Sequence, residues 1–177
     1  MSIKIGLIGA PRSGKDEIAT FLIKNKDFSR LAFADKIKDM YFKESNLTED
    51  YFNSVKGLPE ETLIRNSIWA YSDTMRKKFG KSYFIDPVVQ DIISLNGNVV
   101  VSDVRTKDEL DEMVKLGFKM VIIVRDFKPS ILEPHFFPGS RLRFLDIMGF
   151  PVFWNYSDSL ETAHDDFEKF YNCIILK

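Results

Sequence analysis

Two glycines and a lysine near the start of the chain have the spacing of a phosphate-binding loop. Gly9 and Gly14 frame four residues and Lys15 follows directly, in the segment Gly-Ala-Pro-Arg-Ser-Gly-Lys-Asp. This is the G-x-x-x-x-G-K frame of a Walker A loop. Glycines allow backbone conformations in which several N–H groups converge on phosphate oxygens, and the lysine can neutralise phosphate charge. The predicted phosphate-binding residues are Gly9, Ala10, Pro11, Arg12, Ser13, Gly14, Lys15, Asp16 and Glu17.

The segments on either side of this loop distinguish it from a chance match. Ile3–Ile8 is a short apolar run that is typical of a buried strand. Gly14–Lys24 carries apolar residues such as Ile18 and Leu22 at helical spacing. A strand, a glycine loop and a helix in this order place the positive end of the helix dipole at the bound anion.

Asp16 departs from the usual motif, in which a serine or threonine follows the lysine and its hydroxyl binds Mg²⁺. A carboxylate is a good ligand for a hard cation, directly or through water, so Asp16 is a candidate magnesium ligand. The alternative is that Asp16 caps the N-terminus of the helix.

The rest of the chain alternates between strand-like and helix-like segments. Strands are predicted at Ile3–Ile8, Ser29–Phe33, Asn98–Ser102, Lys119–Val124 and near Val152–Trp154. Helices are predicted at Gly14–Lys24, Ala34–Lys43, Glu60–Phe79, Phe84–Ser94, Lys107–Leu116 and Ser159–Phe170, and Thr48 is the candidate N-cap of one more. This alternation predicts an α/β fold of the three-layer P-loop NTPase class, with a parallel sheet flanked by helices on both faces.

The length of 177 residues fits one domain over residues 1–177. Within it, residues from about 44 to 97 are expected to form a helical insertion. Residues from about 126 to 151 are rich in proline and glycine, which indicates a lid-like segment or a loop that holds a short helix over Ser140–Met148.

The composition excludes several classes of function. A hydrophobic content of 45% and a charged content of 29% are those of an ordinary globular protein. A net charge of -1 supplies no global field for nucleic acid, and the single Cys173 excludes an intramolecular disulfide. The absence of a signal-peptide pattern and of long apolar runs predicts a cytoplasmic protein without a membrane partner.

Asp103 and Arg105 follow the cleanest strand candidate, Asn98–Ser102. Ligands of parallel sheets gather outside the carboxyl ends of the strands, so both residues are expected to lie near Lys15. Asp103 is a candidate for holding magnesium or orienting the acceptor, and Arg105 for binding phosphate. The alternatives are that Asp103 caps the next helix and that Arg105 is a solvated surface residue.

The chain contains further charged residues that suit an acceptor site. Asp35 and Lys38 lie one turn apart on a predicted helix, where a surface ion pair is the alternative. Arg65 and Arg76 are eleven positions apart, close to three helical turns, so both can point to one side of their helix. Candidates for a lid that covers the transferred phosphate are Arg125, Arg141 and Arg143.

Four segments together resemble bacteriophage-type deoxynucleoside monophosphate kinases. They are Arg-Ser-Gly-Lys-Asp at 12–16, Ala-Phe-Ala-Asp-Lys-Ile-Lys at 32–38, Val-Val-Ser-Asp-Val-Arg at 100–105 and Asn-Tyr-Ser-Asp-Ser-Leu-Glu at 155–161. The segments occur in the family's order and span nearly the whole chain. Human-type phosphomevalonate kinases carry a similar Ser-Gly-Lys-Asp loop.

This resemblance implies ATP-dependent phosphorylation of a (deoxy)nucleoside monophosphate to its diphosphate, with ATP and Mg²⁺ as cofactors. It implies that Lys15, Asp103 and Arg105 are catalytic and that Asp16 and Asp103 hold the metal. The acceptor would be bound by Asp35, Lys38, Arg65, Arg76 and Arg105. A homodimer is left open.

Departures from the family pattern in one helix segment and in the lid region keep other functions open. Trp69 occupies the place of a family glutamine, Ser72 replaces a glycine, and the lid motif is not recognisable in His135–Phe144. The alternatives are a kinase of another phosphorylated metabolite, of the phosphomevalonate or dephospho-coenzyme A type, and a nucleotide-binding regulatory protein without transfer activity.

Overall fold

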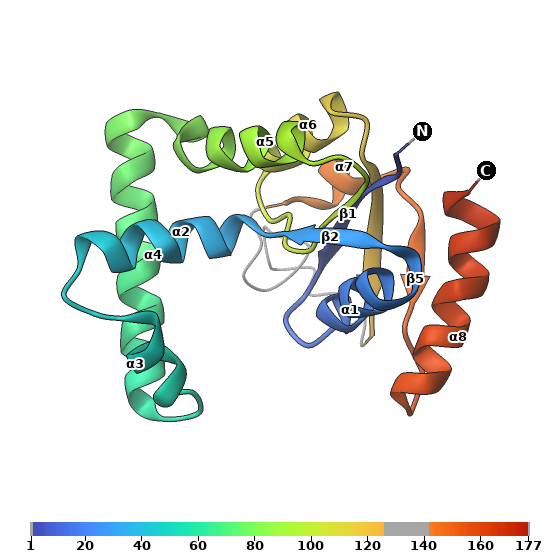
Figure 1. The fold of residues 1–177 in the computed structure, drawn as a ribbon, viewed down its shortest axis with the longest axis horizontal. Coiled ribbons are helices and arrows are strands. Elements are labelled where there is room, and N and C mark those ends of the chain that lie inside the picture. The colour runs from blue at the N-terminus through green and yellow to red at the C-terminus, as the bar shows by residue number, and fades with distance from the viewer. Residues whose placement is uncertain (1, 126–141, 177) are drawn as a thin grey trace. The chain divides into compact units, whose positions relative to one another are not determined.

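The computed structural model describes residues 2–125 and 142–176, and its described strands form one parallel sheet (Figure 1). The sheet has five strands in the order β2-β3-β1-β4-β5. Their bounds are Lys4–Gly9 for β1, Phe28–Leu31 for β2, Asn98–Val101 for β3, Lys119–Val124 for β4 and Val152–Trp154 for β5. The predicted α/β class with a parallel sheet flanked by helices is confirmed.

The central strand β1 pairs with β3 on one side and β4 on the other. Its residues Ile5 and Leu7 face a core that also contains Ile18 and Leu22 of α1, which spans Lys15–Lys26. On the same face this core continues into α8, which spans Leu160–Phe170. The helix α6, which spans Lys107–Lys115, packs against β4. The apolar run at β1 is thus explained by its central position in the sheet.

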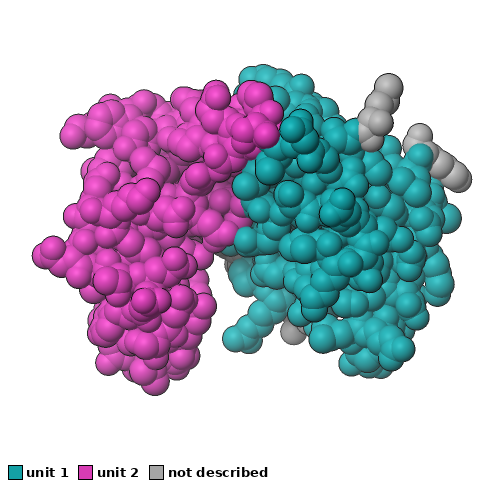
Figure 2. All heavy atoms as spheres, viewed as in Figure 1, with its two compact units in different colours: residues 1–31, 95–177 teal, residues 32–94 magenta. Residues whose placement is uncertain are grey.

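Residues Ala32–Ser94 form a second compact unit, coloured magenta in Figure 2, between Leu31 at the end of β2 and Leu95. All its described regular elements are helices: α2 at Phe33–Glu44, α3 at Glu49–Ser54, α4 at Pro59–Phe79, the 3-10 turn η1 at Lys81–Phe84 and α5 at Ile85–Ser94. A cluster of Phe52, Val55 and Ile64 forms part of its core. The first unit comprises residues 1–31 and 95–177.

Most predicted elements occur within a few residues of their expected bounds, with informative exceptions. The strand predicted over Ser29–Phe33 ends at Leu31, because Ala32 is already the extended N-cap of α2. The helix predicted to end at Phe170 passes directly into a π-helical segment at Tyr171–Ile175, with Tyr171 and Ile175 buried. Apolar periodicity does not distinguish a π turn from the end of a helix.

The proline-rich region is described only in part. The structure shows a short helix, α7 at Phe144–Ile147, within the range predicted for one. Residues 126–141 lie outside the described residues, so the lid expectation for about 126–151 stays a prediction. Among the described helices, none is both long and apolar enough to cross a membrane.

Candidate phosphate-binding site

The predicted phosphate loop lies at the carboxyl end of the central strand. β1 ends at Gly9 and α1 begins at Lys15. From β1 the chain runs to the edge strand β2, returns to β3 beside β1, and then adds β4 and β5 on the other side. The strand order therefore reverses at β1, and such a switch point is where open α/β sheets bind ligands.

Both motif glycines are required by their surroundings. A Cβ on Gly9 would lie 2.6 Å from Ser13 Oγ and 2.7 Å from the carbonyl oxygen of Ile123, a backbone atom of β4. Gly14 has a φ of +92°, and its Cβ would lie 2.2 Å from Asn155 Nδ2. Arg12 is also left-handed, with a φ of 65°. Left-handed residues of this kind occur in loops whose backbone N–H groups converge on an anion.

Lys15 is buried at the start of α1, with 7% of its surface exposed. Its Nζ donates to the carbonyl oxygen of Ala10 at 3.4 Å. Burial lowers the pKa of Lys15, and Arg105 lowers it further, whereas Asp16 and Asp103 act in the opposite direction. Asp103 and Arg105 thus both act on the charge of the loop lysine.

Asp103 lies in the segment that joins β3 to α6 and is 5% exposed. The next residue, Val104, donates its N–H to the carbonyl oxygen of Leu7 at 3.2 Å, which ties this segment to β1. The N-cap of α6 is Thr106, so the alternative reading of Asp103 as a helix cap is wrong. Asp103 is thus a buried carboxylate that acts on the charge of Lys15.

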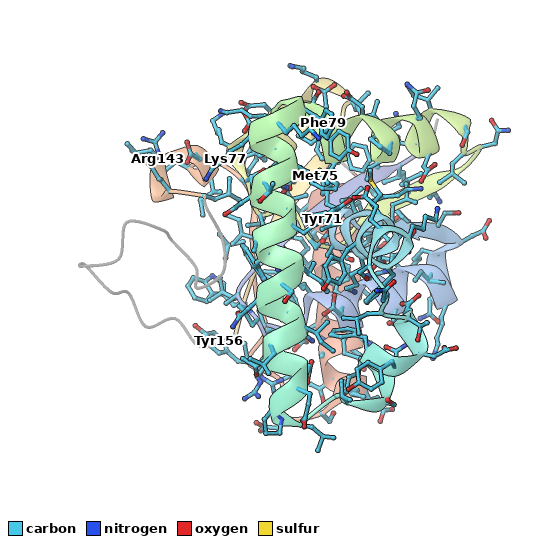
Figure 3. The ribbon with its side chains drawn as sticks, turned by 90° about the vertical axis from the view of Figure 1, so that its left-hand side faces the viewer. Tyr71, Met75, Lys77, Phe79, Arg143 and Tyr156 are labelled. Atoms are coloured by element: carbon cyan, nitrogen blue, oxygen red, sulfur yellow. The ribbon has the colours of Figure 1, made fainter. Side chains whose placement is uncertain are left out.

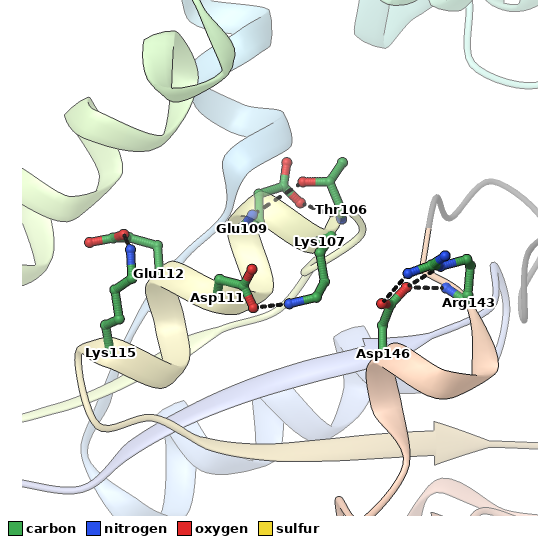
Figure 4. Close-up of polar contacts among 8 residues, drawn as sticks. All are labelled: Thr106, Lys107, Glu109, Asp111, Glu112, Lys115, Arg143 and Asp146. Atoms are coloured by element: carbon green, nitrogen blue, oxygen red, sulfur yellow. Dashed lines mark hydrogen bonds and ion pairs between the residues drawn. The ribbon is translucent and has the colours of Figure 1, made fainter.

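Thr106 and Glu109 form a capping box at the start of α6 (Figure 4). Thr106 Oγ1 accepts from the N–H of Glu109 at 3.3 Å, and Glu109 Oε2 accepts from the N–H of Thr106 at 3.0 Å. The same oxygen accepts from the N–H of Arg105 at 2.9 Å, which fixes the backbone at that residue. Sequence reasoning missed this role, although Thr-Lys-Asp-Glu at 106–109 carries the capping-box spacing.

Asp16 and Asp103 are the carboxylates near the loop that could hold a magnesium ion. Asp16 is exposed in the first turn of α1, whose N-cap is Gly14 without a side-chain cap, so Asp16 does not serve as the cap. No group of three or more metal-binding side chains occurs among the described residues. Mg²⁺ is commonly held by one or two carboxylates, waters and substrate phosphates, so Asp16 and Asp103 would be enough protein ligands for it. Glu17 lies 3.9 Å from His164 Nε2 instead.

Asn155 is a further residue at the loop, and sequence reasoning placed it only in a resembling segment. Its Nδ2 donates to the carbonyl oxygen of Ser13 at 3.0 Å, across 142 positions of the chain. No local sequence pattern predicts such a contact. It depends on β5 lying at the end of the sheet beside β4.

The second unit holds four predicted acceptor residues, and two of them pair with each other. Lys38 Nζ lies 3.2 Å from Asp35 Oδ1, the ion pair that was the alternative reading for this helix. This pair leaves the role proposed for either residue open, because both side chains are partly exposed.

The two arginines of α4 do not converge on one point. Arg65 pairs with Glu61 at 2.5 Å, one turn toward the N-terminus, whereas the guanidinium of Arg76 lies 5.7 Å from the ring of Phe84. Both lie on one side of the helix, but the helical rise separates their Cα atoms by about 16 Å. Figure 3 shows the length of α4, with Tyr71, Met75 and Phe79 one above another along it.

The lid candidates have different surroundings. Arg125 follows β4 and is exposed, and Arg141 lies outside the described residues. Arg143 donates through Nε and Nη2 to the carboxylate of Asp146, at 3.2 and 3.1 Å (Figure 4). This pairing raises the pKa of Arg143 and lowers that of Asp146. Arg143 is therefore already engaged by a carboxylate on α7.

Comparisons with known proteins do not name a family for this chain. No protein-family model matches it, and no curated protein matches its sequence. A solved sugar kinase from Janibacter sp. HTCC2649 aligns over 99% of this chain and 98% of its own, with 12% identity and a TM-score of 0.45. At this identity and TM-score the likeness assigns neither a fold nor an activity, so function is inferred from the residues of the loop.

Proposed function

We propose that the chain transfers the γ-phosphate of ATP to a (deoxy)nucleoside monophosphate with the assistance of Mg²⁺. The observation that carries this proposal is the position of Lys15. It is buried at the carboxyl end of the central strand, where Asp16, Asp103 and Arg105 act on its charge. A buried ammonium group between a glycine loop and two carboxylates suits a magnesium-bound triphosphate.

Burial leaves this ammonium group poorly solvated, which is why its pKa is lowered. A triphosphate would replace the solvation that the ammonium group has lost. It would also bind the loop N–H groups and the N-terminal end of α1. Lys15 would then neutralise charge on the β- and γ-phosphates as transfer proceeds. Binding and catalysis would use the same groups.

Asp16 and Asp103 would hold the magnesium ion, which neutralises charge on the phosphate oxygens when it is bound. Arg105 would bind phosphate oxygens from the neighbouring strand end, because a guanidinium forms two parallel hydrogen bonds to such a group. The attacking oxygen of a monophosphate is already anionic. Positioning and charge neutralisation therefore suffice, and no strong base is needed.

The acceptor assignment rests on the resemblance to phage-type kinases. It places Asp35, Lys38, Arg65 and Arg76 of the second unit around the acceptor nucleotide, and it expects one of the arginines at 125, 141 and 143 to cover the transferred phosphate. Another phosphorylated metabolite is the competing acceptor. A panel that includes phosphomevalonate and dephospho-coenzyme A separates the two.

A second candidate is a nucleotide-binding protein without transfer activity. The ion pairs of Lys38 with Asp35 and of Arg65 with Glu61 favour it, because they engage charges that an acceptor phosphate would need. Breaking such partly exposed pairs costs little, so they do not decide between the candidates. Transfer activity itself decides.

The test is a coupled assay of ADP formation across all ribo- and deoxynucleoside monophosphates and the two metabolites. The wild-type chain should use a small set of nucleotides, and Lys15→Ala should lower kcat/KM by about 10²-fold or more. Lys24→Ala, an exposed lysine on the same helix, is the matched control and should behave as wild type. Equal transfer by Lys15→Ala would contradict the proposal, and ATP binding without any product would support the second candidate.

A further inference from the structure

We infer that Asn155 is a positioning residue that sets the orientation of one phosphate-binding N–H group, that of Gly14. The inference rests on the proposed function, because it assigns a role in phosphate binding at the same loop. The geometry that points to it is the buried contact between the Asn155 amide and the peptide bond joining Ser13 to Gly14.

The sheet places Asn155 firmly. Asn155 follows β5 directly, and its N–H donates to the carbonyl oxygen of Val124 at 2.7 Å, which extends the pairing of β5 with β4. Only 4% of the residue is exposed. Its side chain then donates to Ser13 at 3.0 Å in a buried setting. The position of the amide is thus fixed by the strand and not by the loop.

The donor character of the amide is what matters at this contact. The opposite orientation of the amide would place Oδ1 against the carbonyl oxygen of Ser13, two acceptors with no proton between them. In the observed orientation Oδ1 is buried and has no hydrogen-bond partner among the described residues. An unpaired buried oxygen is unfavourable, so the hydrogen bond from Nδ2 to Ser13 has to offset this cost.

The contact has a direct consequence for the next N–H group. In a trans peptide the C=O of one residue and the N–H of the next point in opposite directions. Because Asn155 holds the C=O of Ser13 on its own side, the N–H of Gly14 is turned to the other side of the peptide plane. That N–H makes no hydrogen bond within the described part of the chain, and it is available to an anion.

Steric fit at Gly14 supports the same inference independently. A Cβ at this residue would lie 2.2 Å from Asn155 Nδ2, so the amide sits against the peptide where only a glycine leaves room. The left-handed φ of Gly14 requires glycine as well. The close approach of the Asn155 amide therefore depends on the missing side chain of Gly14.

The test measures binding of magnesium tripolyphosphate, a probe without base or sugar, by titration calorimetry. Asn155→Leu keeps a side chain that branches at Cγ and removes the donor. Its Kd should rise about tenfold, the factor that corresponds to one lost hydrogen bond of ordinary strength. Asn155→Ala, which introduces no bulk, gives a second reading if the leucine variant does not fold.

Asn98→Leu is the matched control. Asn98 is also an asparagine of the first unit that joins distant segments, since Oδ1 accepts from the N–H of Ile3 at 2.9 Å and Nδ2 donates to the carbonyl oxygen of Lys26 at 3.2 Å. Its loss should lower the Tm and leave the Kd for tripolyphosphate unchanged. A purely structural role for Asn155 predicts instead that both variants lose stability and keep their affinity.

The outcomes separate the inference from the proposed function. If Lys15→Ala loses affinity for tripolyphosphate while both Asn155 variants bind as tightly as wild type, the inference is wrong and the phosphate site stands. If Asn98→Leu loses as much affinity as Asn155→Leu, the effect is general destabilisation and the inference is wrong. If the wild-type chain does not bind tripolyphosphate, the proposed function and the inference both fail.

Discussion

Lys15 occupies a position that is unfavourable for the ligand-free chain. Burial lowers its pKa, which means that the folded state disfavours the ammonium form relative to the unfolded chain. A buried titratable group with a shifted pKa, in a loop at the edge of a sheet where ligands usually bind, is typical of a functional site. Asp16 and Asp103 offset part of this cost, and a bound phosphate would offset more of it.

Replacing this lysine with an apolar residue of similar length should therefore stabilise the ligand-free protein. Lys15→Met is expected to add about 1 kcal/mol at pH 7, which corresponds to a rise in Tm of roughly 2–4 °C for a domain of this size. Thermal unfolding followed by circular dichroism measures it. The same variant should lose binding of ATP.

The gain should depend on pH in a defined direction. Below the lowered pKa of the folded state, both states hold the proton and the full penalty is present. As pH rises from that value toward 10.5, the unfolded chain binds more protons than the folded chain, so the wild type becomes more stable and the difference between the proteins shrinks. A lower Tm for Lys15→Met at pH 7, or a difference that grows with pH, would contradict this account.

The sequence predicted the residues of the loop well and their distant partners poorly. Gly9, Gly14 and Lys15 form a local pattern whose physical requirement can be read from spacing. The contact of Asn155 with Ser13 spans 142 positions, so it depends on the order of strands and has no local signal. The side-chain pairing of Arg143 with Asp146 was also missed, although the two residues are only three positions apart at the short helix α7.

At the scale of the elements, the start of α6 links helix capping to the candidate site. Glu109 is 3% exposed and accepts hydrogen bonds from the N–H groups of Arg105 and Thr106. The carboxylate thereby holds the chain at the point where it carries Arg105 past the carboxyl edge of β3. Stability of the helix end and placement of the arginine are thus coupled.

Glu109→Ala should show this coupling. It leaves two N–H groups without their acceptor, so we expect a loss of about 1–3 kcal/mol in the free energy of unfolding. It should also weaken binding of magnesium ATP, because the backbone at Arg105 is released. Chemical denaturation and titration calorimetry measure the two effects.

Thr48→Ala is the control for this prediction, because Thr48 caps α3 in the second unit by accepting from the N–H of Tyr51 at 3.1 Å. Its loss should cost about 1 kcal/mol of stability and leave the affinity for ATP unchanged. Equal affinity in both variants would show that Glu109 acts on stability alone.

Periodicity predicted most elements because an apolar run or a helical repeat is a local property. The N-cap at Thr48 and the helix end at Gly80 were both found from residue type. The boundary between β2 and α2 was not found in this way, because a buried apolar residue such as Phe33 suits both a strand and a helix. Its helical assignment depends on packing within the second unit.

At the scale of the whole molecule, the chain divides into two compact units. The sequence indicated a helical region from about 44 to 97, and the second unit begins at Ala32, directly after β2. A parallel sheet was predictable from the alternation of elements, whereas the strand order β2-β3-β1-β4-β5 was not, because it is set by long-range pairing.

We proposed that the first unit binds ATP and that the second unit contributes to binding the acceptor. This proposal predicts a pattern of hydrogen exchange. A non-hydrolysable ATP analogue with Mg²⁺ should protect backbone amides at residues 9–17 and 103–106 of the first unit, where the loop and the end of β3 lie. Addition of the accepted nucleoside monophosphate should add protection in α2 and α4 of the second unit. Protection confined to the second unit with the analogue alone would contradict the assignment.

The most direct test of the central claim is titration calorimetry of a magnesium-bound, non-hydrolysable ATP analogue into the wild-type chain and into Lys15→Ala. The account predicts one site per chain for the wild type and an affinity at least about 10²-fold weaker for the variant, because the loop N–H groups and the Lys15 ammonium group bind the same phosphates. No heat of binding with the wild type, or equal Kd values for the two proteins, would contradict it.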